Sequence, residues 1–408
     1  MFSHDCEIEG RVRLIAVLLW ILCSAAVASA QSVTTIAPRA LVMDVGTGAV
    51  LFDKAADEPT APASLAKLMT AELVFRDLKS GKITLDTQFP VSEHAWKTAQ
   101  GGASMFARLG SSIRVEDLLR GLIVQSGADA AIALAEGIGG SEESFAAMMN
   151  KRAGDLGMTH SHFIDCWGSP NSAQTVSARD LAKLAQHVIA TYPDYYHFFG
   201  EKEFTWSKVR QLNRNPILFN EVNGDGLKVG NLPDGGFNLV GSAASGERRL
   251  IVVILDAKSA KDRAEEARKL FNWGFRGFEV KDLFALDEQV GAARVYGGAK
   301  AEVPLLTEAP VRLMTARGAS ERLTGKIVYS GPLLAPVEAG TTVARLKIYH
   351  GATLALDVPL KTGEAVELGD LSQRAKDAAF ELGLQVFNKT LNYAFRSGRK
   401  ATETATAQ

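Results

Sequence analysis

Two pairs of short apolar strands at the ends of a long helical region limit the folds open to this chain. Residues 40–45 and 50–53 are β-type segments joined by Gly46-Thr-Gly-Ala49, a spacing typical of a hairpin. A second adjacent pair is predicted at 237–243 and 250–255. Strands on both sides of a mostly helical stretch predict one antiparallel sheet, closed by the N- and C-terminal pieces and covered by helices.

Helical periodicity fills the stretch between the two strand pairs. Pro62 and Ser64 are start signals for an apolar run that continues through Val74. The same spacing predicts further helices at 115–124, 128–137, 142–156 and 178–191. We therefore expect residues 31–277 to form one α/β (α+β) domain.

The pattern changes near Phe278, where short β-rich runs alternate with Gly- and Pro-containing turns. The runs are 293–296, 311–314, 326–329 and 344–348. This spacing predicts a small all-β domain, a sandwich of about ninety residues, over 278–370.

An amphipathic helix with aromatic side chains is predicted at 371–396, followed by a disordered tail at 397–408. Residues 371–400 contain six basic and two acidic side chains, a net charge of +4. Such a helix fits binding flat on an anionic lipid surface, and we favour this over docking on the protein's own surface.

The first thirty residues have the layout of a secretory signal peptide. Arg11 and Arg13 precede an apolar run, and small residues end at Ala28-Ser-Ala30. The run is about half the length that spans a bilayer. We therefore expect export, with Gln31 as the mature start, and consider a lipoprotein at Cys23 the lesser alternative because Leu22 is bulky.

Composition excludes two broad classes of protein. Removing the signal leaves 43 basic and 43 acidic residues, and the whole chain is 47% hydrophobic and 22% charged. This balance rules out a disordered chain and a wholesale nucleic-acid binder. Any electrostatic function must be local.

Only one cysteine, Cys166, remains after the signal is removed. An intramolecular disulfide is then impossible, so stability must come from the core. A lone thiol is more often a buried small hydrophobe than a nucleophile, and we expect that here.

Ser64-Leu-Ala-Lys67 places a hydroxyl and an amine one turn apart on a helix face. A serine becomes a nucleophile when a neighbour accepts its proton, and a lysine held neutral can do so. Taken alone, the motif more often marks an N-cap serine beside a solvated lysine.

Two further stretches favour the catalytic interpretation: Ser126-Gly-Ala-Asp-Ala130 between helices, and Asp225-Gly-Leu-Lys-Val-Gly230 before a strand. A second K-T-G, Lys361-Thr-Gly363, lies in the β-rich region, and we interpret it as a turn. The histidines form no spaced ligand set and no phosphate-binding fingerprint follows a strand, so neither a metal nor a cofactor is expected.

In order and spacing, these motifs resemble the D-alanyl-D-alanine carboxypeptidases, the low-molecular-mass penicillin-binding proteins. The similarity covers residues 34–395, including the β-rich domain and the terminal helix. Supporting stretches are Glu203–Thr205, Arg210–Asn215, Asn238–Ala243, Glu266–Leu270 and Trp273–Phe275. The resemblance implies the penicillin-recognising serine hydrolase fold.

The resemblance also implies a set of catalytic roles. Ser64 would attack the carbonyl between the last two D-alanines of a peptidoglycan stem pentapeptide, giving an acyl-enzyme that water hydrolyses. Lys67 would be the base, and Ser126 would relay a proton to the leaving amine. Beta-lactams would trap Ser64.

Substrate-binding roles follow in the same way. Lys228 would keep Lys67 deprotonated and attract the substrate carboxylate, which Arg214 would help to hold. Gly230 belongs to the same motif, and the backbone N–H of Asn231 would complete an oxyanion hole with that of Ser64.

Two residues depart from the family pattern. Ala128 stands where S-x-N has an amide, and Val229 stands where K-T-G has a hydroxyl. We therefore keep two hypotheses: an active serine-type carboxypeptidase, and an impaired member that binds cell-wall peptide or a partner. Endopeptidase and weak beta-lactamase activities remain open. The expected location is the periplasm, on the outer face of the cytoplasmic membrane.

Overall fold

The computed structural model describes residues 33–233, 236–319 and 323–379. These residues divide into two compact units at Glu279/Val280. The predicted signal peptide at 1–30, the tail at 397–408 and most of the predicted terminal helix lie outside the described residues. Within the described ranges, no helix combines the length and the apolar character needed to cross a bilayer.

A five-stranded antiparallel sheet forms the centre of the first unit. In spatial order its strands are β2 (Val50–Lys54), β1 (Arg39–Asp44), β9 (Arg248–Ala257), β8 (Phe237–Ser245) and β7 (Gly224–Asn231). Because β1 pairs with β9, the two ends of this unit meet in the middle of the sheet, as the two strand pairs in the sequence predicted.

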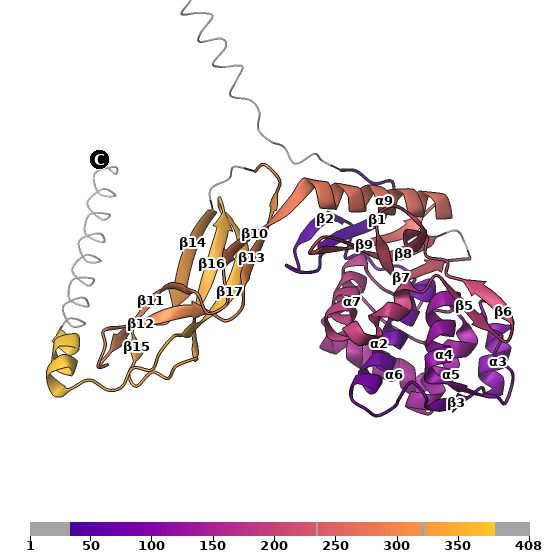
Figure 1. Cartoon of the computed structure of the whole chain (residues 1–408), viewed down its shortest axis with the longest axis horizontal. Coiled ribbons are helices and arrows are strands. Elements are labelled where there is room, and N and C mark those ends of the chain that lie inside the picture. The colour runs from indigo at the N-terminus through magenta and orange to yellow at the C-terminus, as the bar shows by residue number, and fades with distance from the viewer. Residues whose placement is uncertain (1–32, 234–235, 320–322, 380–408) are drawn as a thin grey trace, which may run out of the picture. The chain divides into compact units, whose positions relative to one another are not determined.

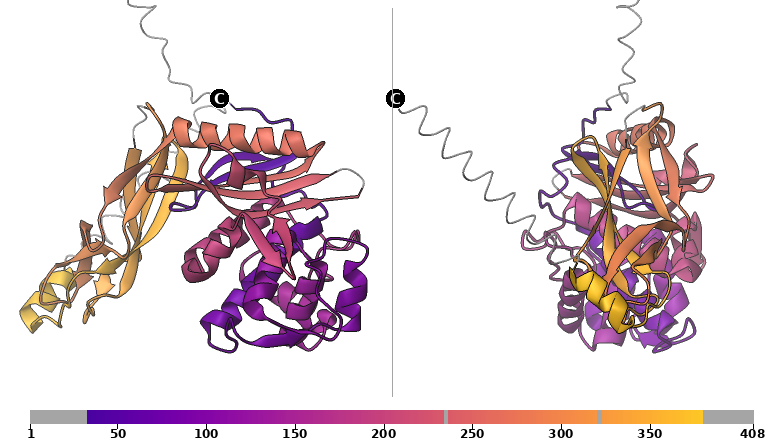
Figure 2. Two further views of the ribbon diagram at one scale, coloured as in Figure 1. Left: turned by 45° about the vertical axis from the view of Figure 1, so that its right-hand side comes forward. Right: turned by 90° about the vertical axis from the view of Figure 1, so that its left-hand side faces the viewer.

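Helices cover both faces of this sheet. Figure 1 shows α9 (Ala260–Gly277) on one side and the other long helices on the opposite side, and Figure 2 shows the same layers from other directions. The opposite side carries α2 (Lys67–Lys79), α4 (Val115–Arg120), α5 (Ala128–Gly139), α6 (Glu142–Asp155) and α7 (Ala178–Thr191).

Smaller elements complete the first unit. They are the helical turns η1 (Ala63–Ala66), η2 (Gly121–Gln125), η3 (His197–Gly200) and η4 (Pro216–Phe219), the helices α3 (Glu93–Ala99) and α8 (Pro193–Tyr196), and the hairpin strands β3 (Gln88–Pro90), β4 (Ser112–Arg114), β5 (Glu203–Trp206) and β6 (Val209–Leu212). The helix predicted at 115–124 is α-helical only as far as Arg120, because the residues that follow form the π-turn η2.

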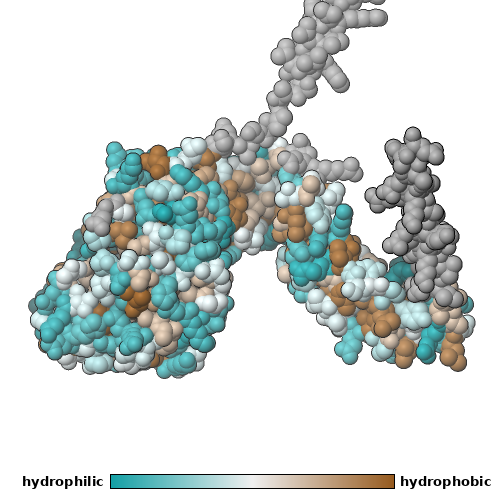
Figure 3. Space-filling model, turned by 180° about the vertical axis from the view of Figure 1, so that it is seen from behind, coloured by the Kyte–Doolittle hydropathy of each residue, from teal (hydrophilic) through white to brown (hydrophobic). Residues whose placement is uncertain are grey.

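Alternation along the strands explains how one sheet serves two cores. Val252 and Ile254 of β9 pack under α9, whereas Ile251, Val253 and Leu255 pack against the helices of the other side. Because successive side chains of a strand point to opposite faces, a strand covered on both faces is apolar throughout. On the face drawn in Figure 3, the surface of this unit is mostly hydrophilic with scattered hydrophobic residues.

The second unit is an all-β domain. Its six-stranded sheet runs, in spatial order, through β14 (Leu323–Tyr329), β16 (Thr342–His350), β17 (Thr353–Thr362), β12 (Glu302–Thr307), β11 (Gln289–Tyr296) and β15 (Leu333–Leu334), beside a separate pair of β10 (Phe278–Phe284) and β13 (Val311–Ala316). Its core is built from the inward residues of both sheets, among them Leu305 and Leu313. Residues 371–379 are helical.

The K-T-G at 361–363 differs from its prediction as a turn. Lys361 and Thr362 are the last two residues of β17. Thr362 is buried, and its hydroxyl donates to the carbonyl of Glu338 at 2.6 Å, while Lys361 pairs with Asp287 at 2.6 Å. These side chains are used within the second unit, so this K-T-G is structural.

Candidate active site

Ser64 lies in the short turn η1 directly before helix α2. Ala63 precedes it in a left-handed backbone conformation, with φ of 46°. Non-glycine residues rarely adopt this conformation, and such strain gathers at functional sites. No side chain caps η1 or α2. Ser64 is therefore not an ordinary N-cap serine.

Lys67 begins α2 and is only 2% exposed. Its Nζ donates to Ser64 Oγ at 3.3 Å and to the carbonyl oxygen of Trp167 at 2.5 Å. Burial lowers the pKa of Lys67 to about 8, helped by the charge of Arg214 and opposed by nearby Cys166 and two carboxylates. An amine with this pKa is substantially neutral near pH 8 and can accept the serine proton.

Ser126 ends the π-turn η2 and has a left-handed φ of 68°. Its Oγ is buried and has no hydrogen-bond partner among the described residues. The π-turn replaces the last turn of the predicted helix, and such wide turns are frequent at functional sites. The hydroxyl is thus free to bond to a group that enters from outside.

Lys228 lies on β7 and is 3% exposed. Its Nζ donates its only hydrogen bond to a described residue to the carbonyl of Ile123, at 3.3 Å. Burial holds the pKa of Lys228 well below its ordinary value, and the charges of Lys67, Arg214 and Arg263 lower it further. The two lysines are therefore close enough to repel one another when both are protonated.

Gly230 brings strand β7 against the backbone of the Ser64 turn. A Cβ at this position would lie 3.1 Å from Pro62 O and Ser64 N and 3.2 Å from Ala63 Cβ. A larger residue would push β7 away from Ser64. Asn231 follows at the end of the strand and lines the same cleft as Ser64.

The predicted residues converge on one cleft of about 470 Å³. Six of them line it, namely Ser64, Lys67, Ser126, Arg214, Gly230 and Asn231. Lys228 is buried and is not one of the lining residues. Both departures from the family pattern, Ala128 and Val229, line the cleft as well. Of the described lining residues, none is a carboxylate.

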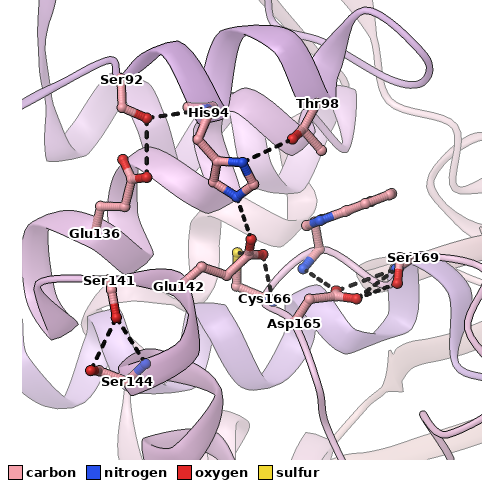
Figure 4. Close-up of polar contacts among 12 residues, drawn as sticks. Ser92, His94, Thr98, Glu136, Ser141, Glu142, Ser144, Asp165, Cys166 and Ser169 are labelled. Atoms are coloured by element: carbon pink, nitrogen blue, oxygen red, sulfur yellow. Dashed lines mark hydrogen bonds and ion pairs between the residues drawn. The ribbon is translucent and has the colours of Figure 1, made fainter.

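Two buried aspartates hold the cleft walls. Asp129 accepts hydrogen bonds from Met105 N, Ala107 N and Ser104 Oγ at 2.6–3.0 Å. Asp165 accepts from the backbone N–H groups of residues 167–169, as Figure 4 shows in part. These bonds fix the loop whose Trp167 carbonyl holds Lys67.

Cys166 lies in the same loop and is fully buried. Its thiol donates to Glu142 at 3.1 Å, and Glu142 pairs with His94 at 2.7 Å (Figure 4). Burial, followed by the carboxylate of Glu142, raises the pKa of the thiol well above its ordinary range. A thiol held in its neutral form is a poor nucleophile, in agreement with the structural role expected for it.

Comparison with known proteins assigns both units. Residues 25–259 match the family model of D-alanyl-D-alanine carboxypeptidase, and residues 278–368 match that of the penicillin-binding protein 5 C-terminal domain. The chain belongs to the D-alanyl-D-alanine carboxypeptidase family. The family, the fold and the class of enzyme predicted from the sequence are thereby confirmed.

Individual relatives of this carboxypeptidase family cover most of the chain. DacD of Escherichia coli strain K12 is 37% identical over 343 residues, which cover 83% of this chain and 88% of that protein. DacC of the same strain is 38% identical, covering 83% and 86%. Penicillin-binding protein 5 of Haemophilus influenzae has a similar structure, with a TM-score of 0.78 and 32% identity over 83% of this chain and 99% of that one.

Several site residues of this family member were missed by the sequence analysis. Asp165, Trp167 and Gly168 lie in a stretch without helix or strand periodicity, and Arg263 looks like any helical arginine. Trp167 acts through its backbone carbonyl, which no side-chain motif reveals. Only Gly168 carried a signal, because glycine marks positions where chains approach closely.

Gly168→Ala tests this close approach. Gly168 has φ of +83°, and an added Cβ would lie 1.8 Å from the carbonyl oxygen of Ala63, beside the nucleophile. We expect a loss of about 3 kcal/mol or more in the free energy of unfolding, and at least a 10²-fold loss in acylation by a labelled penicillin.

Gly140→Ala is the matched control for this measurement. Gly140 has a similar φ of +79°, but no atom lies within 4 Å of its added Cβ. It should cost only about 1–2 kcal/mol in urea unfolding and leave acylation unchanged. Equal effects of the two variants on acylation would contradict the importance of the contact with Ala63.

Proposed function

We propose that this protein removes the terminal D-alanine from peptidoglycan stem pentapeptides through an acyl-enzyme on Ser64. The observation that carries the proposal is the hydrogen bond between Ser64 and the buried Lys67, in a cleft where the hydroxyl of Ser126 has no described partner. Family membership gives the class of substrate.

In the first half of the reaction, neutral Lys67 takes the proton of Ser64 while Ser64 Oγ attacks the penultimate D-alanine carbonyl. The backbone N–H groups of Ser64 and Asn231 stabilise the resulting oxyanion. Ser126 passes a proton, drawn from the lysine pair, to the leaving nitrogen. The C–N bond then breaks, D-alanine leaves, and the peptide remains as an ester on Ser64.

In the second half, Lys67 takes a proton from water, which attacks the ester carbonyl. The C–O bond to Ser64 breaks and the proton returns to Ser64 Oγ. Because two buried ammonium groups repel one another, the lysine pair holds one proton at a time. When that proton is on Lys228, Lys67 is neutral, and Lys228 together with Arg214 attracts the substrate carboxylate.

The alternative is an impaired member that binds cell-wall peptide or a partner protein without turnover. It is motivated by Ala128, which offers no amide to the substrate, and by Val229, which offers no hydroxyl. The active enzyme is favoured because a pure binder has no need for a lysine whose pKa is lowered beside a serine.

We further propose a domain organisation and a location. A signal peptide at 1–30 would export a catalytic domain at 31–277, a β-rich domain at 278–370, a membrane-surface helix at 371–396 and a tail at 397–408. Support comes from the division between compact units at Glu279/Val280 and from the helical residues 371–379, where Leu371 is 81% exposed. The chain would then act in the periplasm, on the outer face of the cytoplasmic membrane.

Ser64→Ala tests the nucleophile. The wild type should bind a fluorescent penicillin covalently and release D-alanine from a synthetic stem pentapeptide, and the variant should do neither, because no ester can form. Equal labelling of variant and wild type would exclude Ser64. Labelling of the wild type without D-alanine release would support the impaired-binder alternative.

The pH dependence of acylation tests Lys67 as the base. Its pKa of about 8 means that the neutral fraction rises roughly tenfold per pH unit below that value and levels off above it. The second-order rate constant for penicillin acylation should follow this rise between pH 6 and 8, measured by stopped flow at constant ionic strength. A rate that is flat or falling across that window would contradict the assignment.

Deletion of residues 371–408 tests the membrane helix. The truncated protein should move from the membrane to the soluble fraction and lose salt-sensitive binding to phosphatidylglycerol vesicles. Deletion of 401–408 alone retains all six basic residues of the segment and should leave binding intact. Unchanged membrane association of the longer deletion would show that the anchor lies elsewhere.

A further inference from the structure

The carboxylate of Glu142 connects two segments that form opposite parts of the cleft lining. Glu142 is the first residue of α6, and the N-cap Ser141 accepts a hydrogen bond from Ser144 N at 3.1 Å. This cap fixes the start of the helix. The Glu142 side chain is 16% exposed and lies between His94 of α3 and Cys166 (Figure 4).

On one side, Glu142 holds the loop that carries the acceptor for Lys67. Its Oε1 accepts hydrogen bonds from Cys166 N at 3.3 Å and from Cys166 Sγ at 3.1 Å. The carbonyl of Cys166 accepts from Thr70 Oγ1 of α2 at 2.6 Å. Both peptide groups of Cys166 are therefore held. The next residue is Trp167, whose carbonyl accepts from Lys67 Nζ.

On the other side, Glu142 holds helix α3. Its Oε2 lies 2.7 Å from His94 Nε2. Because an ionised carboxylate only accepts hydrogen bonds, the ring nitrogen is the donor. The other ring nitrogen, Nδ1, lies 3.5 Å from Thr98 Oγ1. Thr98 lines the cleft, as do residues 101–103, which follow α3.

The loop depends on this carboxylate because Cys166 has no substitute for it. Cys166 is fully buried, and Glu142 is the only hydrogen-bond acceptor of its N–H and S–H groups in the part of the chain that the structure describes. A buried donor without a partner costs about 1–3 kcal/mol. Removal of the carboxylate therefore favours a shift of the loop toward a position where these groups find another partner.

We propose that Glu142 is a positioning residue for the acylation of Ser64. It holds residues 165–169 against α3 and so keeps the Trp167 carbonyl where it orients the amine of Lys67. Glu142 does not line the cleft, so it acts through Cys166 and His94. The assignment rests on the proposed function, since Lys67 is the base of that reaction. A displacement of about 1 Å at a reacting group can cost on the order of 10²-fold in rate.

Stopped-flow acylation by a fluorescent penicillin separates positioning from binding. It gives the dissociation constant of the non-covalent complex and the rate constant of acylation. Glu142→Ala should lower the rate constant by about 10- to 100-fold and change the dissociation constant by less than about threefold. An unchanged rate constant in the folded variant, or a loss confined to binding, would overturn the proposal.

Two matched variants identify the cause of the loss. Glu143→Ala removes a second carboxylate from the first turn of α6, but Glu143 is exposed, so the acylation rate constant should not change. Glu142→Gln retains an acceptor for Cys166 and should stay within about threefold of the wild type. A loss in either variant equal to that in Glu142→Ala would overturn the proposal, because charge near the helix terminus would then be the cause.

The reactivity of Cys166 tests the same contact when no acylation occurs. If the wild type is not acylated, the proposed function fails, but the position of the loop can still be measured. With Cys6 and Cys23 replaced by serine, Cys166 is the only thiol of the chain, and it is fully buried.

Glu142→Ala should raise the rate at which a small thiol reagent labels Cys166 by at least about tenfold without denaturant, because the loop opens more often. Glu142→Gln and Glu143→Ala should label at the wild-type rate. A wild-type labelling rate in Glu142→Ala would overturn the role of Glu142, whether or not Ser64 is acylated.

Discussion

The burial of two neighbouring lysine side chains is the constraint on which the rest of the site depends. Lys67 and Lys228 are 2% and 3% exposed, and their described hydrogen-bond acceptors are a serine hydroxyl and two backbone carbonyls. A carboxylate partner would stabilise the ammonium form and leave no neutral amine to act as a base. Carbonyl oxygens orient the amines without that effect. The surrounding segments therefore supply backbone carbonyls, and not acidic side chains, as hydrogen-bond acceptors for the two amines.

The acidic residues of the site are placed one layer further out. Asp129 and Asp165 accept hydrogen bonds from backbone N–H groups and from neighbouring side chains, and these bonds fix the walls of the cleft. Both still raise the pKa of Lys67, although burial outweighs them. The pKa of Lys67 near 8 therefore reflects a balance. Desolvation favours the neutral amine, and the carboxylates that hold the loops favour the charged amine.

The sequence predicted the parts of this protein that depend on periodicity and on side-chain motifs. The strands at 40–45 and 250–255 and the helix at 178–191 were predicted because their apolar spacing is set by burial. The π-turn at 121–125 was not, because the spacing of apolar residues is the same as in a helix. The Trp167 carbonyl and Arg263 were missed for another reason. Each reaches the cleft only because the fold brings segments together that are far apart in the sequence.

The nucleophile is enclosed by main chain on two sides. Gly168 and Gly230 come from segments far apart in sequence, and each meets the backbone of residues 62–64 where a Cβ would collide. The backbone around Ser64 is thus shaped by atoms that are common to all amino acids, whereas the cleft is also lined by side chains that can vary, among them those at 128, 229 and 263. Substitution of those lining residues can change which acyl donors fit the cleft without displacing the backbone around Ser64. A change in sensitivity to penicillins can therefore arise from lining side chains while the backbone around Ser64 stays in place.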